Sequence, residues 1–186
     1  MKKLIAFLCF IALISCETEK IETVTVPGKY TVELPGFLSK ATTLHDDASL
    51  QYQNTFKEFY VVIIDEPKLA FTSVAEGAGY SPDLQGYFDI LTDSFQKNST
   101  DAKIENKKDI QINGLKGKSF TSEATLEENN IEVFYKVAYV EGKNEYYQIV
   151  TWTLKDSKEK YSQQMDQIIS SFKELGTSRG ADRSKK

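Results

Sequence analysis

Few residues in this chain have the types and spacing for chemistry, and the one histidine is the first of them. His45 is followed directly by Asp46 and Asp47, so an imidazole and two carboxylates stand together in a polar stretch. Nitrogen and oxygen ligands of these kinds bind divalent metals. Three consecutive side chains rarely converge on one ion, however. The pattern therefore leaves two interpretations, a weak metal site and an ordinary polar loop, and favours the loop.

Catalytic arrangements are not indicated elsewhere. No glycine-flanked serine lies near His45 in the sequence, and the two cysteines, Cys9 and Cys16, are both close to the N-terminus. A serine nucleophile needs a histidine beside it as a base, and a cysteine nucleophile needs an accessible thiol. The chain also lacks a phosphate-binding loop, the glycine pattern of dinucleotide-binding folds and the spacing of zinc ligands. We expect neither an enzyme nor a bound cofactor.

Cys16 has a different chemistry, because it ends an N-terminal stretch of the export type. Lys2 and Lys3 precede an apolar run over residues 4–14, which has the length of a signal-peptide hydrophobic region and is too short to span a bilayer. The run ends in Leu-Ile-Ser-Cys, which resembles the bacterial lipobox. The resemblance implies that residues 1–15 are a signal peptide and that Cys16 is acylated. Its acyl chains would then anchor the protein to a membrane.

The segment 16–27 is predicted to be the lipidated N-terminus and a spacer. Glu17, Glu19 and Glu22 surround Lys20, a pattern that loosely resembles the surface-export signal of Bacteroidota lipoproteins; a solvated spacer is the alternative. No aspartate directly follows Cys16, so the inner-membrane retention signal of enteric bacteria is missing. We expect an outer-membrane lipoprotein, on the periplasmic face or the cell surface.

Charge and composition exclude one class of partner. The chain has 23 lysines and arginines against 27 acidic residues, a net charge of −4, and both arginines lie in the C-terminal tail. Nucleic-acid binding needs a basic face, so we expect no nucleic-acid partner. Eleven phenylalanines and ten tyrosines favour strands and a large aromatic core.

The first half of the chain predicts strands followed by a helix. Alternation predicts a strand over residues 29–34 and a hairpin formed by 49–54 and 57–67, whose second arm is apolar on both faces and therefore central in a sheet. Residues 68–80 are predicted to be a loop. Ser81 as the cap, Pro82 at the first position and an apolar stripe predict a helix over 82–97.

The second half predicts an antiparallel meander and a closing helix. A polar linker leads to Asn113-Gly114, a strong hairpin signal, and further turns separate strands 131–140 and 145–154 within a meander over 108–154. From Asp156-Ser157 onward an apolar stripe predicts a helix; its members are Tyr161, Met165, Ile168, Ile169 and Phe172. The basic tail 176–186 is predicted to be disordered.

A row of aromatic residues on the meander strands is the weak candidate for a binding surface. Its members are Tyr135, Tyr139, Tyr146, Tyr147 and Trp152. If part of the row faces outward, it offers the residue types that dominate protein interfaces; the alternative, which is favoured, places most of it in the core. Strand alternation sends Tyr146 and Tyr147 to opposite faces of the sheet.

The order of elements predicts an α+β fold, an antiparallel sheet covered by two main helices. It resembles the PsbP-like fold of the extrinsic photosystem II subunit, a Ran-binding import factor and DcrB-type bacterial lipoproteins. The resemblance rests on segments such as GKYTVELPGF, EFYVVIIDE, NGLKGKSF and IISSFK, and implies a single domain over residues 28–175. Proteins of this fold do unrelated jobs, and its photosynthetic members are associated with calcium and manganese.

The expected function is therefore broad. We expect a membrane-anchored binding or adaptor domain, with the membrane and an envelope protein as partners. The alternative is a carrier of a small molecule or a metal ion that uses a cleft between sheet and helix.

Overall fold

Two antiparallel sheets and three helices make up the part of the chain that the computed structural model describes, residues 20–127 and 129–176. Cys16 and the predicted signal peptide lie outside the described residues, as does almost all of the predicted tail. The lipidation of Cys16 and the disorder of the tail therefore stay predictions.

The larger sheet has seven strands in the order β3-β4-β5-β9-β8-β7-β6. Their bounds are β3 (Ser39–Lys40), β4 (Ala48–Asn54), β5 (Phe59–Pro67), β6 (Thr100–Ile112), β7 (Leu115–Leu126), β8 (Ile131–Glu141) and β9 (Glu145–Leu154). The hairpin of β4 and β5 and the meander are confirmed. The central place of β5 is confirmed too, because it pairs with β4 on one side and β9 on the other.

Three helices pack on this sheet: the two predicted main helices are present, and a third was not predicted. They are α1 (Lys68–Ala78), α2 (Leu84–Asn98) and α3 (Lys158–Ser171). The prediction of a loop over 68–80 is wrong because Phe71 and Ala75, one helical turn apart, both reach the core. The helix ends at Gly79, whose left-handed φ of 80° suits glycine. Two glycines close together had concealed this helix in the sequence.

The predicted helix over 82–97 exists, but it begins two residues later. Asp83, not Ser81, is the N-cap: its Oδ1 accepts a hydrogen bond from the N–H of Gly86 at 2.9 Å, and Ser81 Oγ donates to the same oxygen at 2.6 Å. Gly86 is required here, since a Cβ at this position would lie 1.9 Å from the Ser81 carbonyl oxygen.

The polar linker predicted before residue 108 is strand β6, which lies at the edge of the sheet. Its side chains are mostly exposed and rich in lysine, a usual composition for edge strands that do not invite further pairing. The hairpin to β7 is confirmed: Asn113 and Gly114 both have positive φ, 48° and 86°. Asn113 Nδ2 also donates to the carbonyl of Phe172 at 2.8 Å.

A second sheet holds three strands in the order β1-β2-β10, with β1 (Ile21–Val26), β2 (Tyr30–Pro35) and β10 (Lys173–Glu174). The predicted strand over 29–34 is confirmed as β2. β1 lies inside the range predicted to be a spacer, because alternating Val24 and Val26 pack against the core. Phe172 is also buried, but it caps α3 instead of belonging to the helix.

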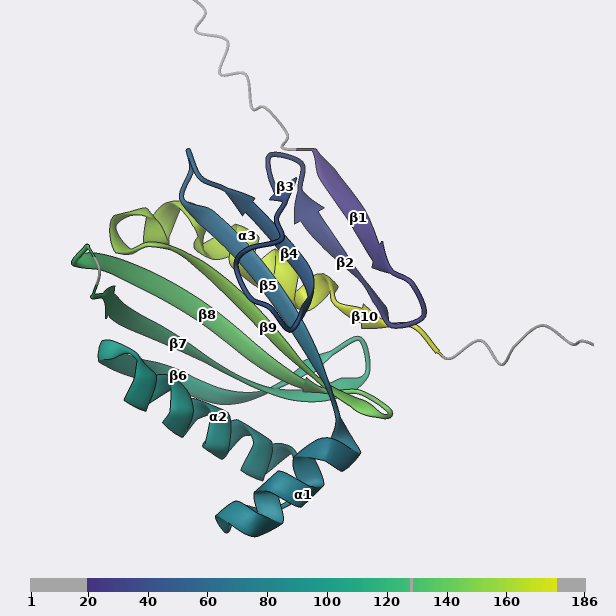
Figure 1. Cartoon of the computed structure of the whole chain (residues 1–186). Helices are drawn as coiled ribbons and strands as arrows, with labels where there is room; N and C mark the ends of the chain where they lie inside the picture. Colours follow the sequence, from purple (N-terminus) through teal and green to yellow (C-terminus); the bar gives the residue numbers. More distant parts are fainter. Residues whose placement is uncertain (1–19, 128, 177–186) are drawn as a thin grey trace, which may run out of the picture.

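The large sheet is covered on both faces, as Figure 1 shows. One core lies between it, α3 and the small sheet, and includes Tyr147, Ile149 and Met165. The other lies under α1 and α2 and includes Phe71 and Tyr146. We call these the α3 face and the α1–α2 face. No helix in residues 20–127 and 129–176 is long and apolar enough to cross a membrane.

Candidate functional site

The loop of residues 41–47 between β3 and β4 contains the predicted metal candidates. Gln51 on β4 holds it: Oε1 accepts hydrogen bonds from the N–H groups of Leu44 (2.7 Å) and His45 (3.1 Å), and Nε2 donates to the His45 carbonyl (2.7 Å). His45 Nδ1 accepts from the N–H of Asp47 at 3.2 Å, while the side chains of Asp46 and Asp47 are exposed. Within the described ranges, no three histidine, cysteine or acidic side chains are grouped to hold a metal ion.

Three of the predicted aromatic candidates lie in the core. Tyr139, Tyr146 and Tyr147 are almost fully buried, as the favoured core interpretation expects, so these three weak candidates do not form an exposed binding surface. Tyr146 packs under α1 and α2, whereas Tyr147 packs on the α3 face, which confirms their opposite directions. Burial raises the pKa of Tyr146 to about 12, so this tyrosine stays neutral.

Tyr135 and Trp152 behave differently, because both are half-buried and stack in a row across the sheet. The register pairs Tyr60 with Trp152 and Trp152 with Tyr135. The ring centroids of Tyr60 and Trp152 are 5.1 Å apart at 9°, and those of Trp152 and Tyr135 are 6.2 Å apart at 28°. Phe95 of α2 meets Tyr135 edge-on at 5.3 Å. We call these four residues the aromatic row.

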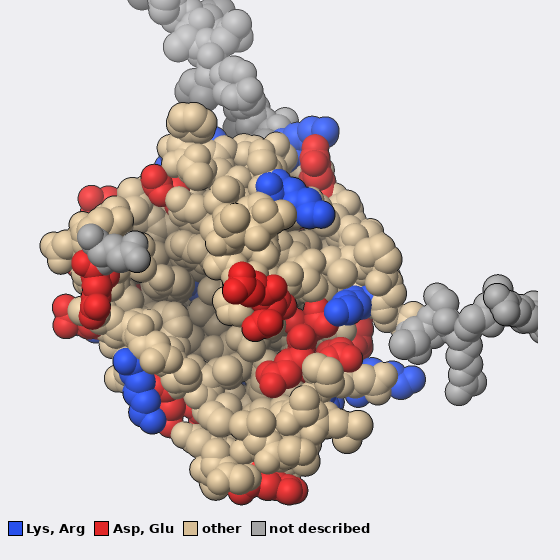
Figure 2. All heavy atoms as spheres, in the orientation of Figure 1, with Lys and Arg blue, Asp and Glu red and all other residues tan. Residues whose placement is uncertain are grey.

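The aromatic row is exposed in part because α2 ends above it. The apolar residues of α2 pack over β6, β7 and β8, and Tyr135 marks the limit of their cover. From there Trp152 and Tyr60 continue across β9 and β5 outside this core. α3 passes behind the sheet in Figure 1, so Figure 2 shows the opposite face, which is hollowed and mostly uncharged within the hollow.

One end of the aromatic row has a polar edge. Tyr60 OH donates a hydrogen bond to Glu58 Oε2 at 2.6 Å. Burial, and then this carboxylate, raise the pKa of Tyr60 to about 12, so its hydroxyl keeps its proton at physiological pH. Tyr60 was not predicted as a site residue because it lies in a continuous apolar run. Only the cross-strand register reveals that it stacks on Trp152.

A second concave region lies beside α3, over β6, β7 and β8. This groove has a volume of about 270 Å³ and is lined in part by Ile110, Ser119, Lys136, Asp166 and Ile169. Lys136 Nζ forms an ion pair with Asp166 at 2.7 Å and donates to the Ser162 carbonyl at 3.1 Å. Ser119 Oγ is buried without a hydrogen-bond partner. The groove therefore offers an apolar floor and an unused hydroxyl.

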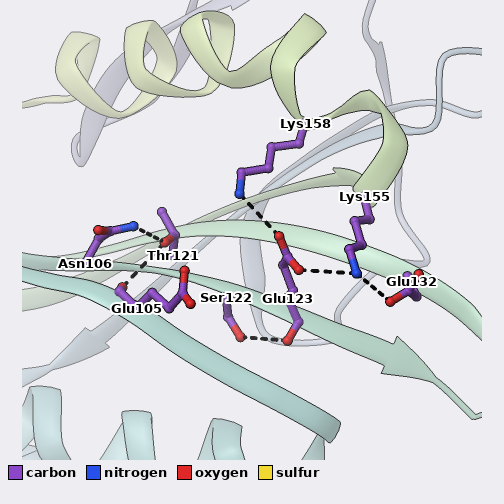
Figure 3. A network of polar contacts seen from close by, with 8 residues as sticks. All are labelled: Glu105, Asn106, Thr121, Ser122, Glu123, Glu132, Lys155 and Lys158. Carbon is purple, nitrogen blue, oxygen red and sulfur yellow. Dashed lines mark hydrogen bonds and ion pairs between the residues drawn. The ribbon is translucent and has the colours of Figure 1, made fainter.

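Next to the groove, an ion-pair network joins the start of α3 to the sheet (Figure 3). Glu123 lies between two lysines: its Oε1 is 3.2 Å from Lys158 Nζ and its Oε2 is 3.4 Å from Lys155 Nζ. Lys155 also pairs with Glu132 at 2.6 Å. The two lysines, Lys158 first, lower the pKa of Glu123. Because every charge in this network has a partner, we interpret it as structural.

The other end of the sheet holds carboxylates that are less well satisfied. Asp65 forms an ion pair with Lys29, but its side chain is only 8% exposed and its Oδ1 has no partner. Glu145 Oε2 is likewise buried without a partner, and burial, followed by the charge of Asp65, raises the pKa of Glu145. Acidic side chains gather toward this lower end of β5 in Figure 2.

Comparison with known proteins gives matches among solved structures alone: no family model matches the chain, and no curated protein matches it. The cyanobacterial PsbP protein CyanoP from Synechocystis sp. PCC 6803 is similar with a TM-score of 0.55 and 12% identity, over 84% of this chain and 92% of that one. A protein of unknown function from Pseudomonas aeruginosa, PA94, gives 0.50 and 10%, over 84% and 99%. LpqN of Mycobacterium tuberculosis, involved in cell envelope biogenesis, gives 0.49 and 12%, over 86% and 93%. At these identities the similarity to CyanoP shows the fold alone: the chain has a PsbP-like fold.

Proposed function

We propose that this chain is a cell-envelope lipoprotein that acts by binding. Acylated Cys16 anchors it to the membrane, and the aromatic row binds a protein partner. The Leu-Ile-Ser-Cys sequence that ends the apolar run supports the anchor. The outer membrane is the proposed location, and no chemical reaction is assigned to the domain.

The observation that carries the proposal is the stacking of Tyr60, Trp152 and Tyr135 on an uncovered part of the sheet. Stacked rings are already held in place by one another, so their exposed apolar edges lose little conformational freedom when a partner covers them. Tyrosine and tryptophan are enriched at the residues that dominate binding energy. The hydroxyl of Tyr60 and the carboxylate of Glu58 supply a polar rim beside this surface.

Anchoring would make a modest surface sufficient. A domain held at the membrane by a short segment meets other proteins of that membrane at a high effective concentration. A weak interface with a few aromatic contacts can then keep a partner bound.

The test is photocrosslinking in living cells, with benzoylphenylalanine in place of Trp152. The matched control carries it in place of Tyr80, a half-buried tyrosine that follows α1 and whose hydroxyl donates to Asp93 at 2.9 Å. We expect one protein to be recovered repeatedly from the Trp152 position, not from the Tyr80 position, and not after Cys16→Ala. The same abundant envelope proteins from both positions would contradict the proposal.

A second candidate function, carriage of a small molecule, rests on the groove beside α3. Ile110 and Ile169 give it an apolar floor, while the Ser119 hydroxyl and exposed Lys108 could bind an anionic end. A small amphipathic carboxylate fits this chemistry, although about 270 Å³ lies just below the usual range for ligand pockets. A panel of fatty acids should raise the melting temperature, and Ile169→Trp, which fills the groove, should abolish the rise. No rise with any chain length would exclude it.

A further inference from the structure

Phe56 in the turn between β4 and β5 is the most exposed large apolar side chain of the described residues, at 99%. The turn itself is well ordered by its own contacts. Asn54 Oδ1 accepts a hydrogen bond from the N–H of Lys57 at 2.9 Å, and Glu58 takes a positive φ of 49°. A turn built in this way holds the Phe56 ring outward, away from both cores.

This turn lies at the same end of the domain as Lys20, where the described chain begins. The N–H of Gly36 donates to the Lys20 carbonyl at 2.6 Å, so β1 starts beside the end of β2. The next residue, Phe37, accepts a hydrogen bond from Asn54 Nδ2 at 2.7 Å, and Lys57 Nζ lies 4.6 Å from its ring centroid. Figure 1 shows the start of β1 and the β4–β5 turn at the upper end of the molecule.

The distance from Cys16 to Lys20 limits how far this end can be from a membrane. Four residue steps span about 14 Å at full extension. β5 runs nine residues from this end to α1, which is about 30 Å. An acylated Cys16 therefore keeps Lys20, and with it the β4–β5 turn at the same end, near the bilayer, while α1 starts about 30 Å away along β5.

We infer that this end of the domain is a membrane-facing edge and that Phe56 inserts into the lipid interface. The inference rests on the proposed anchor at Cys16 and adds the orientation of the domain to it. An exposed phenylalanine ring is stabilised when it leaves water for the boundary between the headgroups and the acyl chains. Insertion of Phe56 holds Tyr60, where the aromatic row begins, close to the membrane surface.

The test uses the lipidated full-length chain in vesicles of phosphatidylethanolamine and phosphatidylglycerol that contain spin-labelled lipid. Cys9 leaves with the signal peptide and Cys16 is acylated, so an introduced cysteine is the one free thiol. An environment-sensitive fluorophore is attached at Phe56→Cys, and in the control at Leu69→Cys on α1, which is 85% exposed. Two further variants carry the fluorophore at Thr55→Cys, one with native Phe56 and one with Phe56→Ala.

We expect the lipid spin label to quench the fluorophore at position 56 and not at position 69. Phe56→Ala should reduce insertion at position 55 about tenfold, as expected for removal of one buried aromatic side chain. Vesicles that carry the protein without quenching at position 56, or with equal quenching at 56 and 69, would overturn the orientation while leaving the anchor intact. Protein that does not float with the vesicles would overturn the anchor, and the orientation with it.

Discussion

The two faces of the seven-stranded sheet are covered to different extents, although they share the same strands. On the α3 face, the helix and the small sheet enclose a continuous core in which Tyr30, Ile149 and Phe172 are fully buried. On the α1–α2 face, the helices bury Tyr139 and Tyr146 but leave Tyr60 and Trp152 half-exposed.

This difference separates stability from binding. A closed core contributes most of the free energy of folding, because each side chain has left water completely. Rings that stay half-exposed contribute less to folding and retain area that a partner can cover. The same β9 strand serves both purposes, since its odd-numbered residues face α3 and its even-numbered residues face the other side.

The largest effect should come from the closed core. Phe172→Ala removes a ring whose centroid lies 4.8 Å from that of Tyr147 and 5.1 Å from that of Tyr30. We expect the free energy of unfolding to fall by about 3–5 kcal/mol, from lost burial and the cavity left behind. Urea unfolding measures it, with Phe172→Leu as a milder control. A loss below about 1 kcal/mol would mean that this face is less closed than its burial indicates.

Trp152→Ala on the open face should cost less stability despite the larger side chain. Part of its surface is already in contact with water, and its main ring contacts are those with Tyr60 and Tyr135. We expect a loss of about 1–2 kcal/mol in urea unfolding. A loss equal to that of Phe172→Ala would remove the distinction between the two faces.

Glu145→Gln tests a less well satisfied part of the closed face, where β5 ends and β9 begins. Burial and the neighbouring Asp65 raise the pKa of Glu145, so the folded state keeps this proton to higher pH than the unfolded state, where the pKa is near 4.5. The native protein should therefore lose stability as pH rises from about 4.5 through the raised pKa.

Glu145→Gln removes that charge, so the variant should be more stable than the native chain at pH 7, by less than about 1 kcal/mol. The two chains should converge below pH 4.5, where both carry a neutral side chain. Chemical unfolding at pH 4, 5.5 and 7 measures this, with Glu22→Gln on β1 as an exposed control. An unchanged or larger native stability at pH 7 would show that Lys29 already compensates the pair.

Most elements of the fold could be predicted from the sequence, because their signals are local. The Asn113-Gly114 turn and the stripe of Tyr161, Met165 and Ile168 need no distant partner to be recognised. α1 was missed because its signal, Phe71 and Ala75 just before Gly77, becomes strong only when Tyr146 supplies a surface to pack on. β1 was missed for a similar reason, because Val24 and Val26 indicate a strand only once there is a core for them to pack against.

The candidate site was harder to predict, because it depends on register. The sequence predicts that Tyr135 and Trp152 lie on strands, but it does not reveal that they lie opposite each other. Tyr60 is 92 residues from Trp152 in the chain, and only the pairing of β5 with β9 brings the two rings into a stack. Burial of Tyr139 and Tyr147, in contrast, depends on which helices cover each face, and no local pattern records that.

Glu123→Gln should give the smallest effect and the opposite pH dependence. Lys158 and Lys155 lower the pKa of Glu123, so its stabilisation is present above the unfolded-state pKa near 4.5 and is lost as pH falls through the lowered value. At pH 7 we expect the variant to be less stable by about 0.5 kcal/mol, since the ion pairs are partly exposed.

The two carboxylates should act independently. Glu123 lies opposite Phe134, which pairs with Thr153, and eight steps along β9 separate Thr153 from Glu145, about 27 Å. The effects of Glu123→Gln and Glu145→Gln should therefore add in the double variant. Because the two single changes have opposite signs at pH 7, the double variant should differ less from the native chain than Glu145→Gln does. A double variant more stable than Glu145→Gln would mean that the network in Figure 3 is itself strained.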